Sequence, residues 1–287
     1  MTFRIHTHGR LHEWIADAKG YFAEEGLTDY VMDQAKVGTG SKAAPAGAYQ
    51  SYEAGRDASI SCACHWTVNM AASNRHGRLY GDAYSVSPCG IFVPQDSPVR
   101  RLRDLAGVEI DVGFQSGSHY TTIQALEAAG VAADAIRLNF AGLPDQRLGR
   151  LLAGESKAGT LFGIQLYLAE QLGLRKVGDA SFMMIGFVPE GVSAEDVRRY
   201  YAALRRAQAD IDLRHQDYAH FYLNEIPAAY HDRVEVAAFG PGERIVFDPY
   251  SPEMYAATHA WVEERAIFTQ EKVGRGSYAE AALTLAG

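Results

Sequence analysis

Apolar residues recur along this chain with two periods, one typical of strands and one typical of helices. Phe3–Thr7 alternates as a strand does, and residues 11–25 carry apolar side chains at the spacing of an amphipathic helix that Gly26 would end. Residues 109–114 and 137–140 predict further strands, and a helical stretch follows each of them. Because strands that alternate with helices pair in parallel under two helical layers, the pattern predicts an α/β protein.

Two strand-like stretches predict that the chain passes twice between separate lobes. Residues 80–94 form a long run that Ser87 and Pro88 interrupt, and proline bends a strand because it cannot donate to the ladder. Residues 182–188 are a candidate for the return passage. A chain of 287 residues is long enough for two lobes, each a mainly parallel sheet flanked by helices. The predicted boundaries are 1–89 plus 188–287 for lobe 1 and 90–187 for lobe 2.

Three segments resemble, in the correct order, those of one protein family. They are AKGYFAEEGL at 18–27, EAGRDA at 53–58, and a longer segment from DSPVRRLRDLAG at 96 to LLAGESKAGT, which ends at 160. Together they resemble the solute-binding proteins of alkanesulfonate, nitrate and taurine uptake, a group that includes thiamine-pyrimidine-synthase-like proteins. The resemblance spans roughly residues 1–190 and implies the two-lobed type II periplasmic-binding-protein fold, with a ligand cleft between the lobes. It does not identify the ligand, since one fold carries many functions.

The composition of the chain limits the binding partners and the cellular compartment that we expect for it. The formal net charge is −8 and no long Lys/Arg run occurs, so a nucleic-acid backbone finds nothing to pair with. The chain also lacks the run of about 18 apolar residues that a membrane span needs. Cys62, Cys64 and Cys89 make no even-numbered disulfide framework, and the first residues lack the apolar core of a signal peptide. We therefore expect thiols and a cytoplasmic location, or a periplasmic one if a leader was removed, and leave a homodimer open.

The turn between the strand at 109–114 and the helix after it is the best candidate for ligand contact. Ser116, Gly117, Ser118 and Tyr120 lie where a strand meets a helix N-terminus, and the free N–H groups of such an end favour an anion. Hydroxyl groups add donors, and glycine lets the backbone approach a ligand. The alternative is a plain helix cap, in which Ser118 satisfies the first amides of the helix. We expect a small anionic ligand at this turn.

A Cys-rich run at residues 61–66 gives lobe 1 a candidate reactive thiol. Cys64 and His65 follow a strand, and a neighbouring imidazole or a helix N-terminus lowers the pKa of a thiol. Strand alternation puts Cys62 and Cys64 on one face, so core packing or mere pocket lining are alternatives. Trp66 is expected to stack on a planar ligand or to close the pocket. The Cys-x-Cys-His spacing is tighter than that of zinc sites, so we expect no metal and no cofactor.

Histidines and an arginine near the N-terminus also fall at the expected cleft. His8 follows the first strand, and Arg10 is the expected anchor for a ligand carboxylate because its fork binds two oxygens. His119, in the turn described above, is a third candidate acid or base beside His8 and His65. A single histidine in such a loop is more often structural than catalytic.

Two main functions remain open at this point, beside a ligand-sensing or regulatory domain, for which the sequence shows no accompanying helix-turn-helix segment. The first is a cytoplasmic enzyme on a binding-protein scaffold, a lyase or hydrolase of decarboxylase or dehydratase type acting on a small carboxylated planar metabolite, since closing lobes exclude water. The second is a solute-binding protein that delivers a small organic anion to an ABC importer. The thiols, the histidines and the missing leader favour the enzyme, whereas the family resemblance favours the binding protein.

Overall fold

Lobe 2 is built on a five-stranded sheet covered by helices on both faces. The computed structural model describes residues 2–34, 47–55 and 57–285. The strands, in order across the sheet, are β10 (Arg175–Asp179), β6 (Cys89–Val93), β9 (Gly159–Phe162), β7 (Glu109–Val112) and β8 (Arg137–Phe140). The helices are α5 (Gly117–Ala128), α6 (Pro144–Leu152) and α7 (Ile164–Gln171), with short 3₁₀ turns η1 (Leu102–Leu105) and η2 (Ala133–Ala135).

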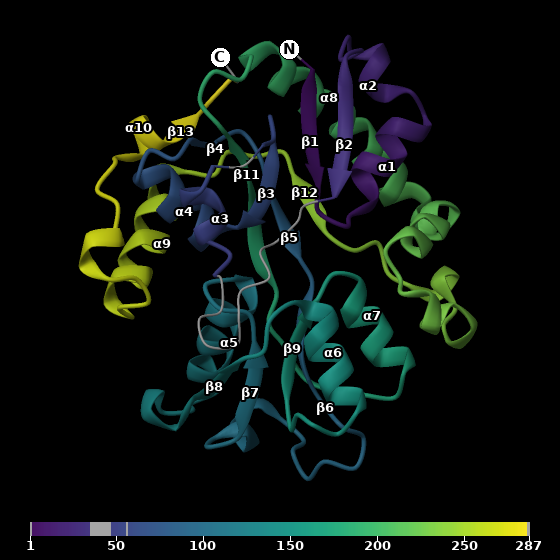
Figure 1. Cartoon of the computed structure of the whole chain (residues 1–287), viewed down its shortest axis with the longest axis vertical. Helices are drawn as coiled ribbons and strands as arrows, with labels where there is room; N and C mark the ends of the chain where they lie inside the picture. Colours follow the sequence, from purple (N-terminus) through teal and green to yellow (C-terminus); the bar gives the residue numbers. More distant parts are fainter. Residues whose placement is uncertain (1, 35–46, 56, 286–287) are drawn as a thin grey trace.

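Lobe 1 lies above lobe 2 in Figure 1 and contains both chain ends. Its main sheet has the order β12 (Arg244–Val246), β5 (Tyr84–Ser87), β11 (Phe182–Val188), β4 (Arg78–Tyr80) and β13 (Ala282–Leu283), and β3 (Ser61–Cys64) also pairs with β11. The parallel pair β1 (Phe3–Thr7) and β2 (Tyr30–Gln34) joins it through a bridge between Ile5 and Ile60.

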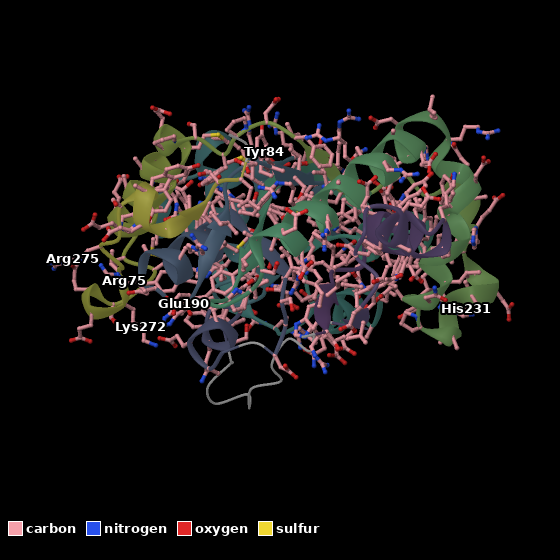
Figure 2. The ribbon with its side chains drawn as sticks, turned by 90° about the horizontal axis from the view of Figure 1, so that it is seen from above. Arg75, Tyr84, Glu190, His231, Lys272 and Arg275 are labelled. Carbon is pink, nitrogen blue, oxygen red and sulfur yellow. The ribbon has the colours of Figure 1, made fainter. Side chains whose placement is uncertain are left out.

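Helices of lobe 1 come from both ends of the chain. From the N-terminal part they are α1 (Leu11–Ala18), α2 (Tyr21–Glu24), α3 (Gln50–Glu53) and α4 (His65–Ser73). From the C-terminal part they are α8 (Ala194–Arg214), α9 (Pro252–Glu264) and α10 (Tyr278–Ala281), with 3₁₀ segments η3 (His215–Asn224), η4 (Ala228–Arg233), η5 (Val236–Ala238) and η6 (Gln270–Lys272). Figure 2 shows His231 of η4 at one end of the molecule and Lys272 and Arg275 at the other, so the chain after β11 covers both flanks. None of the helices in the described part of the chain combines the length and apolar character of a membrane span.

The predicted α/β class is confirmed, but the sheets are mixed and not mainly parallel. The strands that precede helices pair in parallel, as β1 does with β2 and β7 does with β8 and β9. The strands beside the two passages pair antiparallel, because the chain enters each lobe there in the opposite direction. Thus β6 is antiparallel to β9 and β10, and β11 is antiparallel to β3, β4 and β5.

The chain passes twice between the two main sheets. The first is at Pro88, between β5 of one sheet and β6 of the other. The second falls at residues 180–181, because β11 pairs with strands of lobe 1 along its length. The strand at 182–188, which the sequence pattern made a candidate for the return passage itself, pairs with β3, β4 and β5 of lobe 1.

One expected helix is divided in two. Gly20 has a φ of 72°, in the left-handed region that glycine adopts without strain, and it separates α1 from α2. The apolar periodicity of residues 11–25 continues across this break, so periodicity alone predicts a single helix. Gly26, with a φ of 85°, ends the second piece as expected.

Apolar contacts join the lobes on two sides of the space between them. On one side Trp66 of α4 packs against Tyr120 of α5, with ring centroids 5.1 Å apart. On the other side Tyr167 of α7 stacks on Phe239, which follows η5, at 5.2 Å. The space between the lobes is therefore bounded by packed side chains on both flanks.

Candidate ligand-binding site

A cavity of about 370 Å³ lies between the two lobes. This volume is within the range of about 300–1,000 Å³ that small-molecule sites occupy. The wall from lobe 1 is formed by the loop after β1, the end of β3 and the segment before β12, and the wall from lobe 2 by the loops after β7, β8 and β9. Because the carboxyl ends of parallel strands meet at one edge of a sheet, ligands of α/β proteins bind at such positions.

Five helices begin at this cavity. The residue that precedes the first turn of each helix α1, α4, α5, α6 and α7 lines the cavity, and none of the five makes a side-chain capping hydrogen bond to its own helix. These residues are Arg10, Cys64, Ser116, Leu143 and Gly163. The N–H groups of a first turn have no partner inside the helix, and each helix N-terminus carries roughly half a positive charge. The cavity therefore collects the positive ends of five helix dipoles.

The turn after β7 is held in place by its own serines. The Ser116 hydroxyl donates to the carbonyl oxygen of Gly113 at 2.8 Å, and the Ser118 hydroxyl accepts the N–H of Gly113 at 2.9 Å. Ser118 is fully buried and does not belong to the described lining of the cavity, whereas Ser116 and Gly117 do. A Cβ on Gly117 would lie 2.5 Å from the Phe182 ring, so only glycine fits there. Ser118 thus shapes the turn, and Ser116 and Gly117 face the cavity.

Arg147 of α6 is the residue that sequence reasoning missed. Its Nε donates to the carbonyl oxygen of Thr160 at 3.0 Å and its Nη1 to that of Gly142 at 2.5 Å, while the buried Nη2 has no partner among the described residues. In the described chain no carboxylate lies within 4.0 Å of this guanidinium. The side chain is 1% exposed and lines the cavity. Burial lowers the pKa of Arg147 to about 10, so it remains cationic at neutral pH.

A sequence signal for Arg147 was nevertheless present. Leu148 and Leu151 form the buried face of α6, and the helical period puts residue 147 on that same face. A charged residue at an apolar position of an amphipathic helix is seldom buried without a partner. Such a residue just after a strand end is therefore a candidate for ligand contact.

Arg10 also lines the cavity, but its donors are already engaged. Its guanidinium makes ion pairs of 2.7 Å with both Glu13 and Glu243, and its Nη2 donates to the Tyr200 hydroxyl at 3.1 Å. Burial alone would lower the pKa of Arg10, but the two carboxylates, with Tyr200, raise it well above its ordinary value. The structure therefore does not support Arg10 as the anchor for a ligand carboxylate, because its guanidinium already binds two carboxylates of the protein.

The thiol and the imidazole of the Cys-rich run point in different directions. Cys64 lines the cavity, and its Sγ lies 3.1 Å from the Thr67 hydroxyl. The His65 ring turns away: its Nδ1 lies 3.0 Å from the carbonyl oxygen of Met183, and the ring packs 3.7 Å from that of Trp66. Burial raises the pKa of Cys64 to about 11, so the thiol is protonated at neutral pH. A nucleophilic cysteine needs the opposite shift.

The other expected site residues divide between the cavity and the core. His8 belongs to the cavity lining. Trp66 and Tyr120 are nearly or fully buried in the apolar contact between α4 and α5, and the His119 ring stacks on that of Tyr120 at 5.4 Å. The described lining includes none of these three, nor His65. Within the described ranges, no group of three or more His, Cys, Asp and Glu side chains is arranged to hold a metal ion.

Cys64 should react slowly with alkylating agents, and its reaction rate should keep rising with pH. Because burial raises the pKa of this thiol to about 11, the thiolate fraction should grow roughly tenfold for each pH unit between 7 and 9. Mass spectrometry of iodoacetamide-treated protein measures the rate at each pH. A rate that levels off by pH 8 would show an activated thiolate and would revive the catalytic role.

Three buried imidazoles predict a loss of stability in mild acid. Burial lowers the pKa of His12, His65 and His119 to about 4. Unfolding returns each pKa to about 6.5, so the unfolded state binds more protons between these values, and stability falls as the pH drops from about 6.5 towards 4. Each group should contribute a slope of about 1.4 kcal/mol per pH unit near pH 5. Urea unfolding at pH 7, 6 and 5 measures the effect, and a constant free energy of unfolding would contradict the burial of these rings.

The fold matches solved structures that include binding proteins and an enzyme. The alkanesulfonate-binding protein SsuA of Xanthomonas axonopodis pv. citri, bound to MOPS, superposes with a TM-score of 0.73 at 15% identity, over 99% of this chain and 98% of that one. The periplasmic nitrate-binding protein NrtA of Synechocystis PCC 6803 gives 0.64 at 11% identity, over 95% and 83% of the two chains. The desulfurization enzyme DSZB gives 0.57 at 15% identity, over 96% and 97%.

Comparison by sequence gives no further assignment. No protein-family model matches the chain, and no curated protein matches it. The structural matches give no support for a homodimer. At identities this low a structural match carries the fold and leaves the ligand open. The chain has the two-lobed type II periplasmic-binding-protein fold.

Proposed function

We propose that this chain is a periplasmic solute-binding protein that delivers a small organic anion to an ABC importer. The observation that carries the proposal is a buried cation on the lobe 2 wall of the cavity that has no ion pair with any described residue. Arg147 is buried there without a carboxylate partner in the described chain, and α5, α6 and α7 begin at the same wall. Helix N-termini and a buried guanidinium stabilise an anion, because both place N–H donors and positive charge at one point.

The remaining lining supports an anion with an apolar body. Phe162, Phe182 and Met184 line the cavity beside the polar turn. Small-molecule sites combine such a mainly apolar surface with a few polar groups that fix orientation. An alkyl or aryl sulfonate or carboxylate fits this combination better than a bare inorganic anion, which would leave the apolar surface without a partner.

The comparisons support delivery more than catalysis. SsuA and NrtA, named for binding an alkanesulfonate and nitrate, have the higher TM-scores, and the enzyme DSZB has a lower one. Within the cavity, the Cys64 thiol is protonated and lies 3.1 Å from a threonine hydroxyl, and the His65 imidazole bonds elsewhere. The lyase or hydrolase function therefore has less support than binding and release.

Calorimetric titration tests the proposal. In a buffer free of sulfonates, propane-1-sulfonate, butyrate, nitrate and sulfate are titrated into the protein, and each ligand is then recovered and analysed by mass spectrometry. We expect binding of the organic anions in preference to nitrate and sulfate, with the ligand recovered unchanged. Absence of binding by every organic anion would contradict the proposal, and turnover of a bound one would favour the enzyme.

A further inference from the structure

The lobe 1 wall of the cavity contains a buried cluster with two carboxylates and one guanidinium. Arg10 lies between Glu13 and Glu243, with an ion pair of 2.7 Å to each. Tyr200 donates to Glu13 at 2.7 Å, and Ser85 donates to Glu243. The side chains of all three charged residues are between 1% and 6% exposed.

The charges of this cluster do not balance. Arg10 contributes one positive charge, and the two glutamates contribute two negative charges. The neighbouring His12 adds nothing, because burial lowers its pKa to about 4 and leaves it neutral. Burial likewise raises the pKa of Tyr200 well above its usual range, so this phenol is neutral too. Among the described side chains, one negative charge is left over in a buried environment, and the N-terminus of α1, whose first turn contains Glu13, offsets only part of it.

The buried charged side chains of the two walls therefore differ in sign. Glu243 is the carboxylate of the cluster that lines the cavity, and Glu13 does not belong to the described lining. Across the cavity, Arg147 is a buried cation whose Nη2 has no partner among the described residues. A ligand with charge of one sign only would neutralise one wall and leave the other unpaired.

We propose that the ligand is a zwitterion, bound with its anionic group at Arg147 and the turn at Gly117, and with a cationic amine at Glu243. This inference rests on the proposed function and makes it more specific. The amine supplies the missing positive charge of the lobe 1 cluster, and the anionic group supplies the missing negative charge beside Arg147. Phe182 and Met184, which also line the cavity, contact the carbon chain between the two groups.

Matched ligand pairs test the inference by calorimetric titration. Propane-1-sulfonate and 3-aminopropane-1-sulfonate differ by one amine, and the 2-carbon and 4-carbon aminosulfonates vary the separation of the charges. We expect the best aminosulfonate to bind at least about 30-fold more tightly than the alkanesulfonate of the same length, because it pairs a desolvated charge. Equal affinity within each pair would overturn the inference.

Variants connect this preference to Glu243. In Glu243→Gln the preference for the amine should fall to within about 3-fold, while propane-1-sulfonate still binds. The matched control is Glu127→Gln, which removes a carboxylate that pairs with Arg265 at 2.9 Å outside the described lining of the cavity, and it should keep the full preference. A preference that survives Glu243→Gln, or that disappears in Glu127→Gln, would overturn the assignment.

Unfolding of the ligand-free protein gives a second test. Because Glu243→Gln removes the surplus charge and leaves Arg10 paired with Glu13, this variant should be at least as stable in urea as the parent protein. A clear loss of stability would contradict the charge count. The two proposals fail separately: binding of propane-1-sulfonate without a benefit from the amine overturns the zwitterion alone, whereas absence of binding by any sulfonate or carboxylate overturns the proposed function.

Discussion

Replacing Arg147 by glutamine should weaken the binding of an organic anion by about 100-fold or more. The guanidinium is the buried cation of the lobe 2 wall, and truncating one member of a buried charge pair typically costs about 2–5 kcal/mol of binding free energy. Arg147→Lys should retain part of the affinity, because it keeps the charge but loses the fork. Calorimetric titration of propane-1-sulfonate measures both variants, after circular dichroism has shown that each is folded.

Arg150 provides a matched control on the same helix. It is also an arginine of α6, but its guanidinium pairs with Asp111 at 2.7 Å and does not belong to the described lining of the cavity. Arg150→Gln therefore removes the same charge at a distance from the ligand, and Asp111 keeps a hydrogen bond from Asn139. Its affinity should stay within about 3-fold of the parent protein. Equal losses in the two variants would mean that Arg147 acts through the general field or through the fold.

Replacing Arg10 by alanine should destabilise the fold strongly, and more than Glu243→Gln does. It leaves Glu13 and Glu243 buried side by side with no cation between them. Removing one partner from a buried ionic network costs about 3–5 kcal/mol of folding free energy, since an uncompensated charge remains. Urea unfolding measures this loss, and a variant as stable as the parent protein would contradict the account of the cluster.

A triple variant separates charge from packing at the same position. In Arg10→Met, Glu13→Gln and Glu243→Gln combined, no charge remains to be desolvated. Replacing a complete buried ionic cluster by well-packed apolar residues of similar volume is often neutral or stabilising. The triple variant likewise leaves no buried charge unpaired, so it should recover most of the loss caused by Arg10→Ala. A triple variant as unstable as the single one would assign the loss to packing.

The sequence predicted the fold well, but it predicted the neighbours and the pairing directions of individual strands less well. Short motifs with a fixed order identified the fold, and Pro88, which interrupts the apolar run at 80–94, separates β5 of one sheet from β6 of the other. The apolar run at 182–188 predicted a strand with the correct bounds but not its neighbours, because a sequence pattern says nothing about which strands pair with it. The antiparallel pairings beside the passages were missed for the same reason.

Within the candidate site, sequence located the loops but not the orientations of their side chains. The turn at Ser116 and Gly117 lines the cavity, yet its second serine points inward to brace the backbone. Arg10 lines the cavity as expected, but the glutamate that engages its Nη1 is 233 residues away in the sequence. Partners so distant are brought together by the tertiary fold, and composition or spacing cannot reveal them. Arg147 shares the buried face of α6 with Leu148 and Leu151, but the sequence does not reveal that its guanidinium pairs with no described carboxylate.

The most direct test of the central claim is the position of a bound anion. A crystal structure of the complex with 3-bromopropane-1-sulfonate would locate the bromine by anomalous scattering and the sulfonate by its density. We predict the sulfonate oxygens within hydrogen-bonding distance of the Gly117 N–H and the Arg147 guanidinium, with the bromoalkyl chain against Phe182. A sulfonate bound at Arg10 and Glu243, or outside the cavity between the lobes, would contradict the account.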